Sequence, residues 1–240
     1  SSKSMDFNEC EVKKSTKPAF HAKFNELLDL CRNLSEAEIQ KIMKVSEKIA
    51  AATYQRFQNF DSHLQKQAIF AFNGDLYDPI ERSNFTENQI DFMQEHIFIA
   101  SGLYGLLKPL DCIRPYRLEM ATKLGHQSLA SFWRSIATQH IIQTLSHHQN
   151  KHLINLASME YSAILGQELI KDQIINMHFK EDIKGQLKTV AIHAKRARGS
   201  MVNFIIKNYI DQPEELKHFN ENNYRFSAIE SSHYDWVFIR

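Results

Sequence analysis

The sequence is poor in glycine and cysteine, and each shortage argues against a class of protein. Only seven glycines occur among 240 residues. None belongs to a glycine-rich phosphate loop or a Gly-x-Ser-x-Gly turn, which disfavours P-loop, dinucleotide-binding and serine-hydrolase sites. The three cysteines, Cys10, Cys31 and Cys112, are odd in number and far apart. They argue against a disulfide framework and for a reducing compartment, so we expect a cytoplasmic protein.

Long apolar runs are also missing. No run approaches the roughly 20 residues that cross a bilayer, and no signal-peptide pattern opens the chain. We therefore expect a soluble protein without a membrane partner. The chain begins at Ser1 rather than at methionine, and we expect a short strand upstream of it. Without an internal repeat or a Pro/Gly-rich linker, we expect residues 1–240 to form one domain.

Charge is nearly balanced overall but unevenly distributed. The formal net charge is +1, which by itself does not indicate a nucleic-acid partner. However, residues 101–134 hold five cations and two acids, and residues 180–210 hold seven cations and two acids. Residues 71–95 hold six acids and one arginine. If the two basic segments met in space, they would create an anion-binding field that the overall charge conceals.

Periodicity and turn signals predict a mixed order of helices and strands. Helical spacing or a capping box predicts helices over 20–32, from Ser35 to about Ala50, from Thr86 to about Ala100, over 129–145 and over 201–208. Short apolar runs predict strands over 67–72, 152–157, 174–179, 187–194 and 236–239, with a hairpin turn at 181–185. We therefore expect an α/β (mixed α+β) fold with a mixed sheet in the second half and helices around it.

The segment 101–110, Ser-Gly-Leu-Tyr-Gly-Leu-Leu-Lys-Pro-Leu, is the densest motif. Gly102 and Gly105 allow a sharp hairpin whose backbone amides contact a phosphate, as in a helix-hairpin-helix. A helix C-cap with a packing turn is the alternative.

Two arginines flank an aromatic residue directly after this motif. Arg114 and Arg117 on either side of Tyr116 have the composition of a phosphate or stacked-base site. They are equally suited to ion pairs with Asp111 and Glu119.

A polar cluster follows the predicted strand at 152–157. Asn155, Ser158 and Glu160 stand where α/β proteins often gather ligand contacts. Glu160 suits a general acid or base, so an enzyme acting on a nucleotide, a damaged base or a nucleic-acid end is an alternative function. The alternative explanation is structural: these side chains hydrogen-bond to backbone groups at the end of the strand.

Three cations lie between a predicted strand and a predicted helix. Lys195, Arg196 and Arg198 would crowd a helix N-terminus, where the dipole favours anions rather than cations. An anionic partner such as phosphate resolves this conflict, and a solvated loop is the alternative. No histidine has metal-ligand spacing, so we expect no metal and no cofactor.

Taken in order, several of these segments resemble the successive signatures of the peroxide stress protein YaaA family. They are the segments at 2–7, 72–77, 101–110, 114–120, 132–133, 155–158, 160–161 and 195–199. The resemblance covers almost the whole chain. It departs from the family at Ser1, where proline is usual.

The resemblance implies a DNA-binding protein of the hydrogen peroxide stress response that limits iron-dependent damage, with no established catalytic activity. It further implies a compact fold with a basic cleft and a helix-hairpin-helix, which we place at 101–105. DNA would be bound by structure more than by sequence. The residues that we expect to contact it are Lys3, Gly102, Tyr104, Gly105, Lys108, Arg114, Tyr116, Arg117, Lys195, Arg196 and Arg198.

Overall fold

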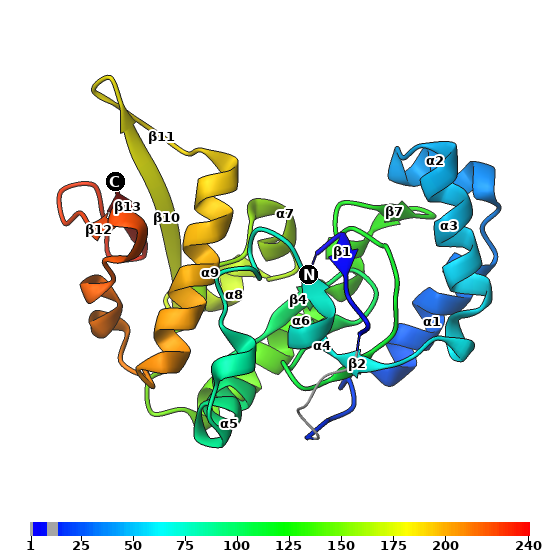
Figure 1. The fold of residues 1–240 in the computed structure, drawn as a ribbon, viewed down its shortest axis with the longest axis horizontal. Coiled ribbons are helices and arrows are strands. Elements are labelled where there is room, and N and C mark those ends of the chain that lie inside the picture. The colour runs from blue at the N-terminus through cyan, green and yellow to red at the C-terminus, as the bar shows by residue number, and fades with distance from the viewer. Residues whose placement is uncertain (1, 9–13) are drawn as a thin grey trace. The chain divides into compact units, whose positions relative to one another are not determined.

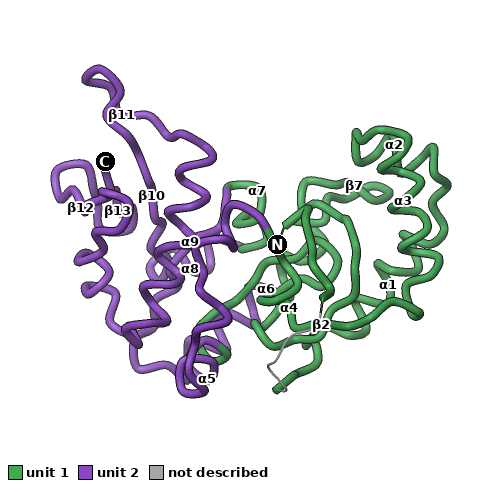
Figure 2. Tube along the Cα trace, in the orientation of Figure 1, with its two compact units in different colours: residues 1–73, 94–137, 159–165 green, residues 74–93, 138–158, 166–240 purple. Residues whose placement is uncertain are grey.

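The computed structural model describes residues 2–8 and 14–240, so Cys10 lies outside the described residues. The chain forms two compact units, each assembled from three segments (Figure 2). Unit 1 comprises residues 1–73, 94–137 and 159–165, and unit 2 comprises residues 74–93, 138–158 and 166–240. Whether they function as the single domain expected from the sequence stays a prediction.

Unit 1 combines helices with short two-stranded pairs (Figure 1). Its helical elements are α1 (His21–Arg32), α2 (Glu36–Met43), α3 (Glu47–Gln58), η1 (Phe60–Ser62), α4 (Ala68–Ala71), the first half of α6 (Leu129–His147) and α7 (Met159–Ser162). Its strands are β1 (Ser4–Met5), β2 (Lys66–Gln67), β3 (Phe72–Asn73), β4 (Ile99–Ser101), β5 (Gly105–Leu107), β6 (Cys112–Ile113), β7 (Lys123–Leu124) and β8 (Gln127–Ser128). The pairs are β1–β3, β2–β6, β4–β5 and β7–β8, all antiparallel.

The helix predicted from Ser35 to about Ala50 is divided in two. The capping box at Ser35 is present, with the Ser35 hydroxyl accepting from the Glu38 amide and the Glu38 carboxylate accepting from the Ser35 amide. Lys44 then adopts a left-handed conformation with φ of 50° and ends α2. Ser46 is extended and precedes α3. The apolar stripe continued across this break, so periodicity alone did not reveal it.

Two other predicted elements of this region differ from the structure. Residues 67–72 form a helical turn, α4, between two short strands rather than one strand, because the amides of Ala68 and Ile69 donate to the carbonyls of Asp111 and Pro109. The helix from Thr86 has its capping box but ends at His96 rather than near Ala100. Residues Ile99–Ser101 form strand β4 instead.

Unit 2 is built around a mixed five-stranded sheet. Its strands are β9 (Leu153–Asn155), β10 (Ile174–Ile183), β11 (Gln186–Lys188), β12 (Arg225–Phe226) and β13 (Asp235–Ile239). Its helical elements are η2 (Arg82–Asn84), most of α5 (Glu87–His96), the second half of α6, α8 (Gln167–Ile170), α9 (Ala191–Lys207), η3 (Pro213–His218) and η4 (Glu221–Asn223).

The strand order is β11-β10-β13-β12, and β9 also pairs with β10. β10 is parallel to β9 and β13 and antiparallel to β11. The turn between β10 and β11 uses left-handed conformations at Lys184 and Gly185, as a tight hairpin requires. The mixed α and β fold and the mixed sheet in the second half are confirmed.

The two faces of this sheet differ in character. Met177 and Phe179 of β10 and Phe238 of β13 are buried, on the face that alternation assigns to the apolar core, and α9 lies beside β10 (Figure 1). Asn176 and His178 alternate with them and are only half-buried. The second face therefore carries polar side chains.

Helix α9 begins ten residues before the helix predicted at 201–208. The strand expected over 187–194 ends at Lys188, and the helix starts at Ala191. Gly199 precedes the helix predicted from the sequence but lies within α9. A Cβ there would be 2.0 Å from the carbonyl oxygen of Leu76, so the glycine permits close packing rather than ending a helix.

Candidate nucleic-acid interface

The segment at which we expected a helix-hairpin-helix is a buried β-hairpin. Strands β4 and β5 flank its turn in place of helices. At Gly102 a Cβ would lie 2.3 Å from the carbonyl oxygen of Leu118. Gly105 has φ of +77°, and a Cβ there would meet the Trp133 ring at 2.7 Å. Both glycines are buried, so they serve packing within unit 1.

The two tyrosines of this region also belong to the core. The Tyr104 ring stacks on Phe24 at 4.6 Å, and its hydroxyl accepts from the Arg114 amide at 3.1 Å. The Tyr116 and Ser101 hydroxyls share a hydrogen bond of 2.7 Å. Burial raises the pKa of the Tyr104 hydroxyl well above its usual value. Neither ring is exposed for stacking on a base.

The charged groups of Lys108 and Arg114 contact other residues of unit 1. The Lys108 ammonium donates to the Glu95 carbonyl at 2.8 Å and lies 4.1 Å from the centre of the Phe98 ring. Burial lowers the pKa of Lys108. The Arg114 guanidinium donates to the Asp61 carbonyl at 3.2 Å. These cations stabilise loops, which accounts for part of the positive charge of 101–134.

Lys3 and Arg117 share one carboxylate. Lys3 Nζ lies 3.0 Å from Glu119 Oε2, and Arg117 lies 3.3 Å from Glu119 Oε1. The Lys3 side chain is 63% exposed and that of Arg117 is 18% exposed. The ion-pair interpretation of Arg117 is therefore correct, and this group retains a single net positive charge.

The three cations of 195–199 lie within α9 rather than before it. Lys195 and Arg198 are three residues apart and therefore share a helix face, whereas Arg196 lies toward the opposite side. Lys195 and Arg196 are exposed, and Arg198 is half-buried. The prediction of three cations crowded at a helix N-terminus is therefore wrong in its geometry.

Arg198 is the least compensated of these side chains. Among the described residues its buried Nε atom has no hydrogen-bond partner, and the same is true of Arg114 and Arg117. The guanidinium groups of Arg114 and Arg117 make other contacts, whereas no ion pair joins Arg198 to a carboxylate in the part of the chain that the structure describes. Burial, with no opposing charge, lowers the pKa of the Arg198 guanidinium. A partly buried charge without a counter-ion is costly, and a bound anion removes that cost.

The residues proposed for catalysis are placed in different units. Glu160 lies in unit 1, and its Oε1 accepts from the Ala121 amide at 3.1 Å. Asn155 and Ser158 lie in unit 2. The side-chain oxygen Oδ1 of Asn155 accepts from the Ala157 amide at 3.1 Å. Glu160 and Asn155 therefore each satisfy backbone groups, as the structural explanation of this cluster required.

A polar row that sequence reasoning missed crosses three parallel strands of unit 2. Asn155 Nδ2 donates to Asn176 Oδ1 at 2.8 Å, and Asn176 Nδ2 donates to Asp235 Oδ1 at 3.3 Å. His178 Nε2 lies 2.8 Å from the same Asp235 oxygen. The alternation of polar and apolar residues in 175–179 was the signal that pointed to this row.

A carboxylate on the other face of β10 joins three elements. Glu181 Oε1 lies 2.7 Å from His193 Nδ1 and 3.2 Å from the Arg240 guanidinium, and Tyr224 donates to it at 3.4 Å. Burial raises the pKa of Glu181, but the hydrogen bonds from His193 and Arg240 outweigh it and leave the pKa below its usual value.

Residues 2–8 and 14–240 contain neither a candidate membrane span nor a candidate metal site. No helix there has the length and apolar character of a membrane span. No group of three or more His, Cys, Asp or Glu side chains is arranged to hold a metal ion.

Comparison with known proteins gives one family and several close relatives. Residues 1–230 match the family described as peroxide stress protein YaaA. A UPF0246 protein of Rickettsia bellii is 47% identical over 242 residues, which cover all of this chain and 98% of the relative. A UPF0246 protein of Rickettsia peacockii is 44% identical over 241 residues, again covering all of this chain and 97% of the relative.

Proposed function

Because the chain belongs to the peroxide stress protein YaaA family, we propose that it acts in the peroxide stress response by binding the phosphate backbone of DNA through α9. The contacts are made by Arg198 and Lys195 on one face of the helix. Arg196 adds long-range attraction from the other side. Binding of this kind depends on backbone geometry more than on base sequence.

The uncompensated charge of Arg198 is the observation that carries this proposal. A guanidinium forms two parallel hydrogen bonds with a phosphate, which suits a half-buried side chain better than a mobile ammonium does. Lys195, three residues earlier on the same face, is exposed and extends the positive surface. A phosphate at Arg198 would supply the counter-charge that the described protein residues do not.

The cations of unit 1 have a smaller role in this proposal. Lys108 and Arg114 hold backbone carbonyls, and Glu119 offsets one of the charges on Lys3 and Arg117. Lys3 is the most accessible of the four. We assign it an electrostatic contribution, and the basic cleft inferred from the family resemblance stays a prediction.

The test is the affinity of Arg198→Ala for fluorescent DNA, measured by anisotropy across a salt series. Duplex, single-stranded, mismatched and flapped DNA are compared, so that the preferred structure emerges from the same experiment. Loss of one charged hydrogen-bonding group weakens binding by about tenfold or more. It also reduces the dependence of log affinity on log salt by about 0.9, since one fewer phosphate is neutralised.

Two further variants separate charge from geometry. Arg198→Lys keeps the positive charge and should therefore keep the salt dependence. It should lose affinity, because an ammonium cannot form the two parallel hydrogen bonds that a guanidinium forms with a phosphate. Arg225→Ala removes an exposed arginine of β12 in the same unit and should bind like the unmodified protein. Equal binding by the Arg198→Ala and Arg225→Ala variants would show that α9 is not the interface.

By occupying DNA during peroxide stress, the protein would limit iron-dependent damage to it. Cells that carry Arg198→Ala in place of the unmodified protein should survive peroxide as poorly as cells without the protein. Survival equal to that of unmodified cells would separate the stress role from DNA binding.

A further inference from the structure

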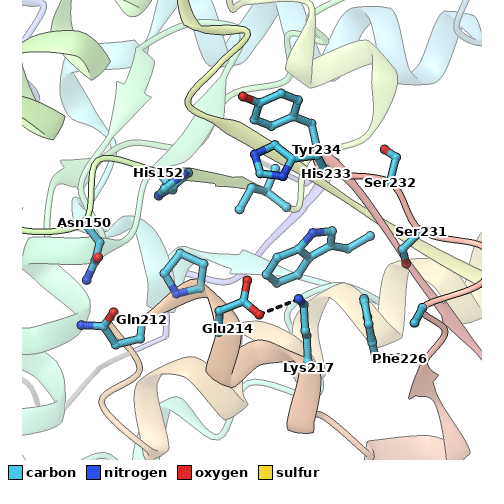
Figure 3. A pocket seen from close by; sticks show the side chains of 14 residues that line it. Asn150, His152, Gln212, Glu214, Lys217, Phe226, Ser231, Ser232, His233 and Tyr234 are labelled. Atoms are coloured by element: carbon cyan, nitrogen blue, oxygen red, sulfur yellow. Dashed lines mark hydrogen bonds and ion pairs between the residues drawn. The ribbon is translucent and has the colours of Figure 1, made fainter.

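A second site is suggested by a pocket at the edge of the unit 2 sheet. The pocket has a volume of about 480 Å³, within the range of about 300–1,000 Å³ that is typical of small-ligand sites. It lies where β9, β10 and β13 begin, between the sheet and η3 (Figure 3). Every lining residue belongs to unit 2, and α9 contributes none of them.

The charge of the lining favours a neutral occupant. Its only formally charged residues are Glu214 and Lys217, which form an ion pair with each other (Figure 3). The Lys217 ammonium also lies 4.5 Å from the centre of the Trp236 ring and 5.1 Å from that of Phe226. Because its cation is already partnered, this pocket differs from α9 and does not suit a phosphate.

The walls and the rim of the pocket are chemically different. Pro213 and Phe226 are half-buried and provide the accessible apolar wall, next to Ile175 and Trp236, which are each only 4% exposed. Gln212 and the imidazole of His152 stand at the rim (Figure 3), and neither side chain makes a hydrogen bond with another described residue. A ligand that contacts both the wall and the rim needs an apolar surface beside hydrogen-bonding groups. A planar heteroaromatic ring satisfies both.

From this combination we infer that the pocket binds a nucleobase. Its flat faces pack against the wall, and its edge, which carries both donors and acceptors, hydrogen-bonds to Gln212 and His152. Such an occupant comes either from a free nucleoside or from an unpaired base of a DNA strand. The inference does not depend on phosphate binding at α9, since the two sites use different residues.

The two tryptophans provide a direct readout. Trp236 lines the pocket, whereas Trp133 is fully buried in unit 1, where its Nε1 donates to the Gly102 carbonyl. The probes are adenosine, guanosine, cytidine and thymidine, added to the 15N-labelled protein while both indole N–H signals are followed by NMR. Trp236→Phe assigns the signals. At least one nucleoside should move the Trp236 signal saturably and leave the Trp133 signal in place.

A paired variant tests the rim contacts. His152→Ala with Gln212→Ala should weaken the nucleoside response by about tenfold, because two hydrogen bonds are lost. The matched control is His126→Ala, an exposed histidine of unit 1, which should leave the response unchanged. A Trp236 signal that no nucleoside moves, or that ribose or benzene moves equally well, overturns the inference. An equal response in the paired variant overturns it too.

Two DNA duplexes identify the source of the base. If a duplex with one unpaired base moves the Trp236 signal and its fully paired counterpart does not, the occupant is a strand base. If only nucleosides move it, the occupant is a free nucleoside. The Arg198→Ala variant should retain the nucleoside response, so failure of phosphate binding at α9 and failure of base binding here are distinguishable.

Discussion

Gly199 and Arg198 are neighbours in α9 that contribute in different ways. The absence of a side chain at Gly199 allows the helix to approach the Leu76 carbonyl. Gly199→Ala should therefore lower the free energy of unfolding by about 3 kcal/mol, because the added methyl overlaps backbone atoms that cannot move independently. Urea denaturation measures the change.

Gly185→Ala is the matched control for this substitution. Gly185 has φ of +79° and open space around its Cβ position, so only backbone strain of about 1 kcal/mol is expected. Equal losses at the two glycines would mean that close packing against Leu76 is not what requires Gly199.

Residue types located the cations of the candidate site but not their surroundings. Lys195, Arg196 and Arg198 were predicted from charge alone. The burial of Arg198 depends on tertiary packing and could not be deduced. Conversely, Gly105 and Tyr104 matched a phosphate-binding loop in composition, yet packing around Trp133 and Phe24 explains both. Glycine and tyrosine serve cores as well as ligands, so composition does not separate the two roles.

Among the elements, the break between α2 and α3 offers a test of backbone strain. Lys44 has φ of 50°, a conformation that costs a residue with a Cβ about 1 kcal/mol. Lys44→Gly should raise the free energy of unfolding by about 0.5 kcal/mol, after the greater entropy of glycine in the unfolded chain is subtracted.

The comparison variant for this break is Lys48→Gly, which places the same substitution inside α3. It should lower stability by about 1 kcal/mol, because glycine is a poor helix former. Urea denaturation of both variants gives the comparison. A loss of stability in Lys44→Gly would contradict the strain argument.

Elements with an uninterrupted pattern were predicted, and those set by distant contacts were not. Helices α1 and α6 and strands β9 and β13 match their periodicity or apolar runs, whereas β10 continues past its predicted end to Ile183, through residues predicted as a turn. In contrast, α4 replaces a predicted strand because the backbone after β2 bonds to the carbonyls of residues 109 and 111. Helix α9 was missed for its first ten residues because the apolar run over 187–194 was interpreted as a strand and the cations after it as a turn.

For the molecule as a whole, Glu181 links stability to pH. Its pKa is lower in the folded protein than the ordinary value of 4.5. The carboxylate therefore stabilises the fold above that value, and this contribution is lost as the pH falls through the lowered pKa. At about pH 7 the free energy of unfolding of the unmodified protein should exceed that of Glu181→Gln. The difference should disappear as the pH falls toward about 3.

Urea denaturation of both proteins at a series of pH values measures this difference. Asp182→Asn, at the exposed neighbouring position, serves as the charge control. A gap between the unmodified protein and Glu181→Gln that stayed constant with pH would show that the pKa of Glu181 is the same in the folded and unfolded states.

The assembly of each unit from three separated segments has a consequence for synthesis on the ribosome. Unit 1 requires residues 159–165, so it is completed only after more than half of the chain has emerged. Residues 74–93 belong to unit 2, whose sheet includes β13 near the end of the sequence. They therefore lack their packing partners until almost the whole chain has been synthesised. Ile80, Ile90 and Met93, buried in the finished protein, remain exposed during that interval. Apolar segments that stay uncovered during synthesis favour aggregation, so we expect the yield of folded protein to fall when translation outpaces folding.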